Sequence, residues 1–153
     1  MIITYSRIFF FLFHLTLLIN IGHSQSATFT SVTSGNFDNP VGNLGSPWSI
    51  TSGTDSDGIP DKGDEIIINV GHTITASSST VSEVSSFTIN GTLILSLTYD
   101  FRVWGSNNAF LTAITSTNNG TISGAGTLYF VTNNNFSNTG TISSAEIKSG
   151  YGT

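Results

Sequence analysis

The chain has 153 residues and a formal net charge of −5, with nine acidic residues, four basic residues and no cysteine. This length is enough for one domain. The acidic excess argues against nucleic acid or an anionic membrane as a partner, because both require a basic surface. Charged residues make up only 8% of the chain, against about 25% in a typical soluble domain. Solubility must therefore come from hydroxyl and amide side chains, which suit turns and strand faces better than helices.

The first 24 residues have the pattern of a secretory signal peptide. Arg7 provides a positive N-terminal region, and a mostly apolar run of 14 residues follows at positions 8–21. Gly22-His23-Ser24 then fits a cleavage site after Ser24, with cleavage after Ser26 as the alternative. The apolar run is short for a membrane span, which needs about 20 residues. We therefore expect a secreted protein whose mature form does not span a membrane; a retained anchor and a buried helix are the alternatives.

Residues 25–63 predict a loop-rich N-terminal cap. All three prolines of the chain lie in this stretch, together with many Gly, Asn, Asp and Ser residues, which favour turns. The segment 27–32 is expected to form a first strand. Trp48 and Ile50 are expected to pack onto the rest of the fold.

From residue 64 onward the chain contains no proline, and apolar residues alternate with polar ones as they do in β-strands. In the segment 65–70 this alternation places Ile66, Ile68 and Val70 on one face. In the segment 93–103 it predicts one long strand, because a helix would scatter the apolar residues around its axis. The apolar face of that strand would carry Leu93, Leu95, Leu97, Tyr99, Phe101 and Val103.

A glycine motif repeats four times within residues 64–153. It begins at positions 71, 91, 120 and 140, with spacings of 20, 29 and 20 residues, and leads each time into a short β-branched or leucine segment. About 20 residues form one coil of a β-solenoid, and the longer spacing fits one coil with an insertion. We therefore expect an all-β solenoid whose stacked rungs need no disulfides. A β-sandwich is the alternative, because Asn-Gly at 90–91 and 119–120 is also a hairpin signal.

Residues 48–95 resemble a known family. The resemblance is carried in order by Trp48, Gly58-Ile59-Pro60, Gly63-Asp64 with its isoleucine strand, Gly71-His72-Thr73-Ile74, and the segment from Phe87 to Leu93. This order is similar to the opening of the eight-glycine domain and related repeats of large bacterial surface proteins. The resemblance implies a right-handed parallel β-helix of the pectin-lyase-like type in a secreted or cell-surface protein. Since those proteins are much longer, we expect residues 64–153 to be incomplete coils whose open C-terminal rung can self-associate.

An acidic cluster in the cap is the candidate metal site. Asp55, Asp57, Asp61 and Asp64 surround a glycine bend, and carboxylates at alternate positions can wrap Ca²⁺. The spacing is not that of an EF-hand, because Gly58 follows the second aspartate directly. The alternative is a solvated turn in which aspartate and glycine serve the backbone geometry. No other cofactor is expected.

No catalytic residue is predicted. His72 is expected to be a polar corner residue, since the mature chain has no second histidine and no cysteine with which it could hold a transition metal. Asp100 and Arg102 lie two positions apart on one strand face, where a surface ion pair is expected; β-helical polysaccharide lyases also use acids with a basic residue. Trp104 shares this face, so it could stack on a sugar ring, or it could lie buried under the following loop with Phe110.

These features favour a non-catalytic extracellular or cell-surface module with a structural or adhesive role, whose polar face binds a polysaccharide or another cell-surface ligand. The second hypothesis is the N-terminal part of a β-helical carbohydrate-active enzyme, a polysaccharide lyase or a glycosidase. Ice or mineral binding is disfavoured, because the threonines do not recur in a fixed T-x-T array.

Overall fold

The computed structural model describes residues 26–77, 81–105, 114–131 and 134–150. The predicted signal peptide, residues 1–24, lies outside the described residues. Within the described ranges the protein is all β, with 15 strands and no helix. This part of the chain therefore offers no helix that is long and apolar enough to cross a membrane.

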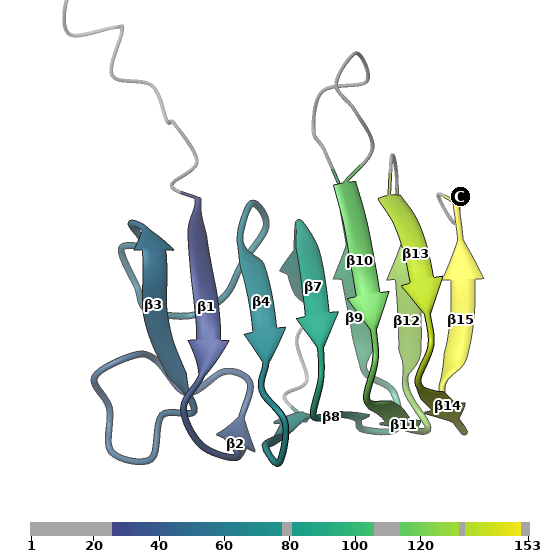
Figure 1. The fold of residues 1–153 in the computed structure, drawn as a ribbon, viewed down its shortest axis with the longest axis horizontal. Coiled ribbons are helices and arrows are strands. Elements are labelled where there is room, and N and C mark those ends of the chain that lie inside the picture. Colours follow the sequence, from purple (N-terminus) through teal and green to yellow (C-terminus); the bar gives the residue numbers. More distant parts are fainter. Residues whose placement is uncertain (1–25, 78–80, 106–113, 132–133, 151–153) are drawn as a thin grey trace, which may run out of the picture.

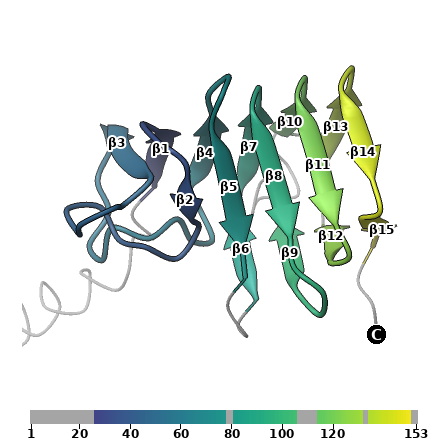
Figure 2. The ribbon, with the colours of Figure 1, turned by 90° about the horizontal axis from the view of Figure 1, so that it is seen from below.

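The strands form three sheets, which Figures 1 and 2 show from two directions. Sheet A contains, from edge to edge, β3 (Trp48–Gly53), β1 (Ala27–Ser31), β4 (Glu65–Ile68), β7 (Ser86–Ile89), β10 (Ile114–Asn118) and β13 (Asn134–Asn138). Sheet B contains β2 (Gly35–Asn36), β5 (Thr73–Ala76), β8 (Thr92–Leu95), β11 (Thr121–Gly124) and β14 (Thr141–Ser143). Sheet C contains β6 (Ser82–Val84), β9 (Asp100–Val103), β12 (Thr127–Phe130) and β15 (Glu146–Ser149).

From β4 onward, consecutive strands lie in different sheets, and every third strand pairs with its predecessor in parallel. The chain thus runs through the three sheets in turn, one triplet of strands after another. The hairpins that a β-sandwich would need at Asn90-Gly91 and Asn119-Gly120 do not form, because each dipeptide links strands of two different sheets. The sandwich alternative is therefore wrong at both positions. Among the described strands, only β1 and β3 pair antiparallel.

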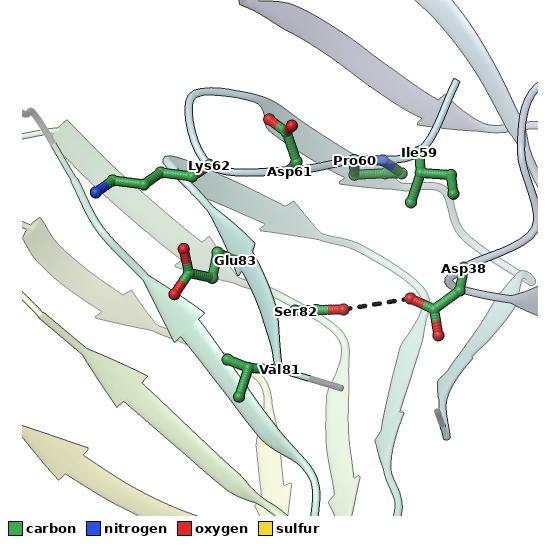
Figure 3. Close-up of a pocket in the computed structure, with 8 residues that line it drawn as sticks. All are labelled: Asp38, Ile59, Pro60, Asp61, Lys62, Val81, Ser82 and Glu83. Carbon is green, nitrogen blue, oxygen red and sulfur yellow. Dashed lines mark hydrogen bonds between the residues drawn. The ribbon is translucent and has the colours of Figure 1, made fainter. Parts of the chain in front are cut away.

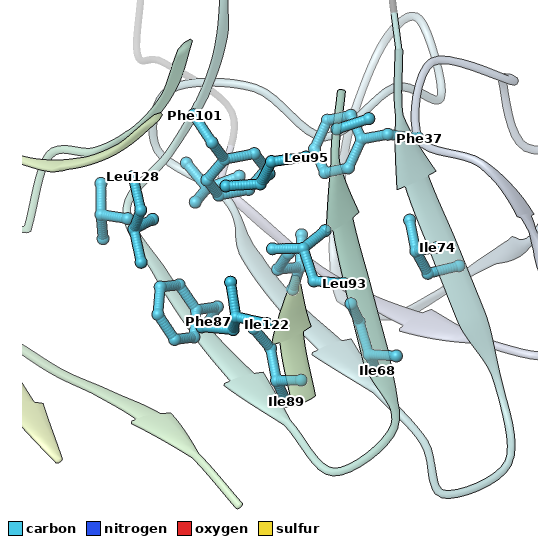
Figure 4. Packing of buried hydrophobic residues seen from close by; sticks show 14 of the residues in the cluster. Phe37, Ile68, Ile74, Phe87, Ile89, Leu93, Leu95, Phe101, Ile122 and Leu128 are labelled. Carbon is cyan, nitrogen blue, oxygen red and sulfur yellow. The ribbon is translucent and has the colours of Figure 1, made fainter. Parts of the chain in front are cut away.

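The core lies between the three sheets and consists of side chains stacked in register (Figure 4). Ile74, Leu93 and Ile122 occupy the same position on β5, β8 and β11, and none of them is exposed. Every second residue of a strand points inward, which is why the alternation in the sequence was informative. Each fully buried aliphatic side chain of this kind stabilises the fold by roughly 1.5–3 kcal/mol.

The glycine repeat marks the corners where successive triplets touch. A Cβ on Gly120 would lie 2.0 Å from the carbonyl oxygen of Gly91, and one on Gly140 would lie 2.2 Å from the carbonyl oxygen of Gly120. No side chain fits at such distances, so glycine is required here for close backbone approach. The insertion in the longer repeat precedes β10, and it includes residues 106–113, which lie outside the described part of the chain.

The predicted long strand over residues 93–103 is wrong in its middle. The chain turns between β8 and β9, where Leu97 is 73% exposed and Thr98 has a φ of 72°. The alternation hid this turn, because Leu95 before it and Tyr99 after it are both buried. Val70 was likewise assigned to the inner face, but it is 79% exposed in the turn that follows β4.

The threonines recur more regularly than the sequence suggested. Thr73, Thr92, Thr121 and Thr141 lie in register on adjacent strands of sheet B. The unequal spacing of the repeats concealed this ladder in the linear sequence. The next outward position of the same strands is irregular and carries Thr75, Ile94, Ser123 and Ser143.

The N-terminal cap packs as the sequence predicted. The expected first strand forms as β1, which pairs with β3 on one side and with β4 on the other. Trp48 is 3% exposed, its ring contacts Phe29 and Phe37 edge to face, and its Nε1 donates a hydrogen bond of 2.8 Å to the Phe37 carbonyl. Ile50 is partly buried against the same core.

At the other end of the stack, β13, β14 and β15 are edge strands of their sheets within the described residues. Phe136 and Ile142 are partly buried there, and Ile147 is 43% exposed. Self-association through this rung stays a prediction.

Candidate functional site

The outer face of sheet C gathers charge in a chain that has little of it. We define the sheet C face as the outward side chains of β6, β9, β12 and β15, namely Glu83, Asp100, Arg102, Thr127, Tyr129, Glu146 and Lys148. The strands alternate, so the neighbours of these residues on β9 and β12 are buried while the face itself meets solvent. On this face acidic, basic and aromatic groups lie side by side.

Four residues of the sheet C face form a row across the strands. Glu83 is in register with Arg102, Arg102 with Tyr129, and Tyr129 with Lys148. Adjacent strands lie about 4.8 Å apart, so the row places one functional group at each such step. It presents an acid, a base, an aromatic ring and a second base along one line.

Ion pairs hold the long side chains of this row in place. Arg102 lies 3.5 Å from the Glu83 carboxylate and 3.9 Å from that of Asp100, and Lys148 lies 2.8 Å from Glu146. The predicted Asp100–Arg102 pair is therefore confirmed. Such exposed pairs add little to stability, so their main effect here is on side-chain orientation.

Tyr129 has a charged neighbour on each side of the row. The Nζ of Lys148 lies 5.3 Å from the centroid of the Tyr129 ring. The pKa of Lys148 is raised, first by its hydrogen bond to Glu146 and then by Tyr129. Lys148 therefore stays protonated at neutral pH and keeps its donors beside the ring.

A pocket of about 440 Å³ opens beside the row (Figure 3). Its polar lining consists of Asp38, Asp61, Lys62, Ser82 and Glu83. Glu83 belongs both to this pocket and to the sheet C face, so the two features are continuous.

The buried side of the pocket carries a hydrogen-bonded network. Ser82 is 6% exposed and donates to the Asp38 carboxylate at 3.4 Å. Its hydroxyl also hydrogen-bonds to the hydroxyl of Tyr99, which is 2% exposed. The network links Asp38, through Ser82, to Tyr99 in the core.

Trp104 lies at the end of β9, next to this pocket. The Nζ of Lys62 lies 3.6 Å from the centroid of the Trp104 ring, in a cation–π contact. Lys62 therefore occupies one face of the Trp104 ring, for which sugar stacking and burial under the following loop were the two alternatives. The loop residues 106–113, which include Phe110 and were considered as a cover for Trp104, lie outside the described part of the chain.

The aspartates of the acidic cluster serve the backbone of the cap. Asp55 accepts a hydrogen bond from the backbone N–H of Asp57 at 3.1 Å, and Asp57 accepts one from Ile59 at 2.9 Å. Asp64 is fully buried and accepts hydrogen bonds from the backbone N–H groups of Ala27 at 2.7 Å and Asp61 at 2.9 Å. Asp64 thus ties the acidic loop to the start of β1.

Burial and mutual repulsion raise the pKa values of two of these aspartates. Burial raises the pKa of Asp64, although its two backbone hydrogen bonds act in the opposite direction. Burial, followed by the charges of Asp64, Asp55 and other nearby acids, raises the pKa of Asp61 to about 6. Among the described residues, no group of three or more His, Cys, Asp or Glu side chains could hold a metal ion. A calcium site at the four aspartates stays a prediction.

His72 lies at the corner between β4 and β5. Its Nδ1 is 2.8 Å from the hydroxyl oxygen of Ser31, which also accepts a hydrogen bond from the backbone N–H of Asn69. The imidazole therefore joins the corner of one triplet to β1, consistent with a polar corner residue.

The chain matches no family model, no curated protein and no solved structure. The resemblance of residues 48–95 to the eight-glycine domain therefore stays a prediction.

Sequence reasoning found Asp100, Arg102 and Trp104 but missed the partners that complete the row. Glu83 precedes Arg102, and Tyr129 precedes Lys148, by about one repeat length of 20 residues. Applying the glycine repeat to the charged residues would have aligned these two pairs. The repeat would not have joined the Glu83–Arg102 pair to the Tyr129–Lys148 pair, because the insertion lies between the two pairs in the sequence.

Proposed function

We propose that this chain is a segment of a right-handed parallel β-helix that acts outside the cytoplasm as a non-catalytic structural or adhesive module. The three-sheet arrangement supports this, since each triplet of strands corresponds to one coil. The signal-peptide pattern and the resemblance of residues 48–95 point in the same direction.

In this proposal the module binds a polysaccharide through the sheet C face, and the row of Arg102, Tyr129 and Lys148 is the observation that carries it. An aromatic ring offers an apolar face on which a sugar ring can stack. The flanking guanidinium and ammonium groups supply donors, and their paired carboxylates supply acceptors, for the hydroxyl groups of a sugar. An extended row suits a polymer better than a single small molecule, because successive units can meet successive strands.

Binding of the purified protein to a panel of neutral and charged polysaccharides, followed by calorimetry on the best ligand, tests the proposal. Tyr129→Ala is expected to weaken binding by about 2- to 10-fold, the value of one aromatic contact. Thr117→Ala is the matched control, because Thr117 is an outward residue on β10 of sheet A. Equal affinities of the two variants, or no polysaccharide bound by the unmodified protein, would refute the proposal.

A second candidate is a carbohydrate-active enzyme, favoured by one feature of the pocket. Asp61 has a pKa of about 6 and lines the same pocket as Glu83. A carboxyl whose pKa is raised towards neutrality, with a second carboxyl in the same pocket, is a pattern found in glycosidases. Release of reducing ends from the bound polysaccharide, lost in Asp61→Asn, would favour this candidate; binding without release would favour the non-catalytic module.

A further inference from the structure

The pocket beside the sheet C face carries more negative than positive charge. Asp38, Asp61 and Glu83 line it, against Lys62 alone. Lys62 extends away from Asp38 (Figure 3), and its amine lies over the ring of Trp104. Arg102 approaches Glu83 from the sheet side at 3.5 Å, so it neutralises one of the three carboxylates only in part.

The shape of the pocket fits an organic group better than a metal ion. Its volume of about 440 Å³ lies within the range of small-molecule sites, about 300–1,000 Å³. Ile59, Pro60 and Val81 contribute apolar surface to its lining. The carboxylates are spread around this volume, and no group of three or more ligating side chains in the described residues could hold a metal ion. A ligand with both an apolar face and a positive charge would match these features.

Contacts within the fold position the acidic residues of the pocket. Asp38 accepts a long hydrogen bond of 3.4 Å from Ser82, whose hydroxyl also bonds to that of Tyr99. The backbone of Asp61 is fixed by its hydrogen bond to Asp64, which is fully buried. Glu83 lies on β6 in register with Arg102, whose guanidinium is 3.5 Å from its carboxylate. Backbone positions fixed in this way lose little freedom when a ligand binds.

The raised pKa of Asp61 also favours a positively charged ligand. After burial, its causes are the neighbouring carboxylates of Asp64, Asp55, Asp57 and Glu83, so negative charge is under-compensated at this place. A positive group near Asp61 would favour its ionised form and would itself be bound more tightly.

We infer that the pocket is a subsite for the protonated amine of an amino sugar in the polysaccharide that lies on the sheet C face. The ammonium group lies among the carboxylates of Asp38, Asp61 and Glu83, and the sugar ring packs against the apolar part of the lining, which Ile59, Pro60 and Val81 provide. Glu83 joins the two sites, so one chain can occupy both. This inference rests on the proposed function of the sheet C face.

Calorimetry with two oligosaccharides of equal length, one of glucosamine and one of N-acetylglucosamine, tests the inference. The glucosamine oligomer is expected to bind at least 10-fold more tightly, because acetylation removes the charge and fills the pocket. Asp61→Asn is expected to abolish most of this preference. Asp57→Asn is the matched control, since it removes the same charge from the same loop at a residue that adds to the negative charge near Asp61 but does not line the pocket, and it is expected to keep most of the preference.

Four outcomes would overturn the inference. Equal affinity for the two oligomers, with Tyr129→Ala still weakening both, would remove the amine subsite and leave the proposed function standing. If Asp57→Asn lost the preference for glucosamine as much as Asp61→Asn did, general electrostatic attraction would explain the preference and no amine subsite would be needed. The pocket would be a metal site if calcium chloride bound to the unmodified protein and displaced the glucosamine oligomer, but did not bind to the Asp61→Asn variant. Failure of both oligomers and of every other polysaccharide to bind would overturn the proposed function as well.

Discussion

Replacing Gly120 by alanine tests whether the corners of the stack are as tight as the structure indicates. The added Cβ would lie 2.0 Å from the carbonyl oxygen of Gly91, which is backbone and cannot rotate away. An ordinary contact needs more than 3 Å, so the two corners must separate by about 1 Å. That movement strains the hydrogen bonds from the N–H groups of Gly120 and Thr121 to the Ile89 and Gly91 carbonyls, both 2.9 Å long.

The expected cost follows from these two effects. Overpacking of this kind costs about 1–3 kcal/mol, and two weakened backbone hydrogen bonds add about 1 kcal/mol each. Gly120→Ala should therefore lower the free energy of unfolding by about 3–5 kcal/mol, a large part of the roughly 5–15 kcal/mol that stabilises a typical domain. Gly71→Ala is the control. Its Cβ meets nothing within 4 Å, but its φ of 82° is left-handed, so only about 1–2 kcal/mol is expected.

Urea denaturation followed by tryptophan fluorescence and circular dichroism measures both variants. If Gly120→Ala costs no more than Gly71→Ala, close approach of the corners does not explain the glycine repeat, and the stacking distances are wrong. If Gly120→Ala does not fold at all while Gly71→Ala folds, the result agrees with the upper end of the estimated loss of stability.

Three further predictions concern the core, the cap and pH. Leu93→Ala should lower the free energy of unfolding by about 2–5 kcal/mol, because Leu93 is fully buried. Leu97→Ala should change it by less than about 0.5 kcal/mol, because Leu97 is exposed. Equal urea midpoints for the two variants would contradict the turn between β8 and β9. Trp48→Phe should cost about 1–3 kcal/mol, since the Phe37 carbonyl loses its donor, and a neutral result in the same assay would show that water replaces the indole. The folded pKa of Asp61 is raised from 3.8 to about 6 and that of Asp64 is also raised, so the folded state binds protons more tightly, and stability should fall as pH rises from about 4 to about 6. Thermal melts across this range check the sign, and a smaller slope in Asp61→Asn identifies the group.

Local pattern predicted much of the core but not the path of the chain through it. Ile66, Ile68 and Trp48 were placed inward from alternation and composition, and all three are buried. The turn at Leu97 and Thr98 was missed because the alternation of buried residues continues across it. An alternation with a period of two shows which side chains face the core. It does not show whether the strand continues or whether the chain turns into the next sheet.

The candidate site was harder to predict because it is made by register rather than by a motif. Arg102, Tyr129 and Lys148 are far apart in the sequence and become neighbours only through the pairing of β9, β12 and β15. The register of these pairings decides which residue of one triplet meets which residue of the next. A change of one residue in that pairing would turn Tyr129 from the outer face to the core and bring Leu128 out. The same close-packed glycine corners that stabilise the stack therefore also set the register on which the proposed binding row depends, so destabilising variants at Gly120 should lose polysaccharide binding together with folding, whereas Tyr129→Ala should lose binding alone.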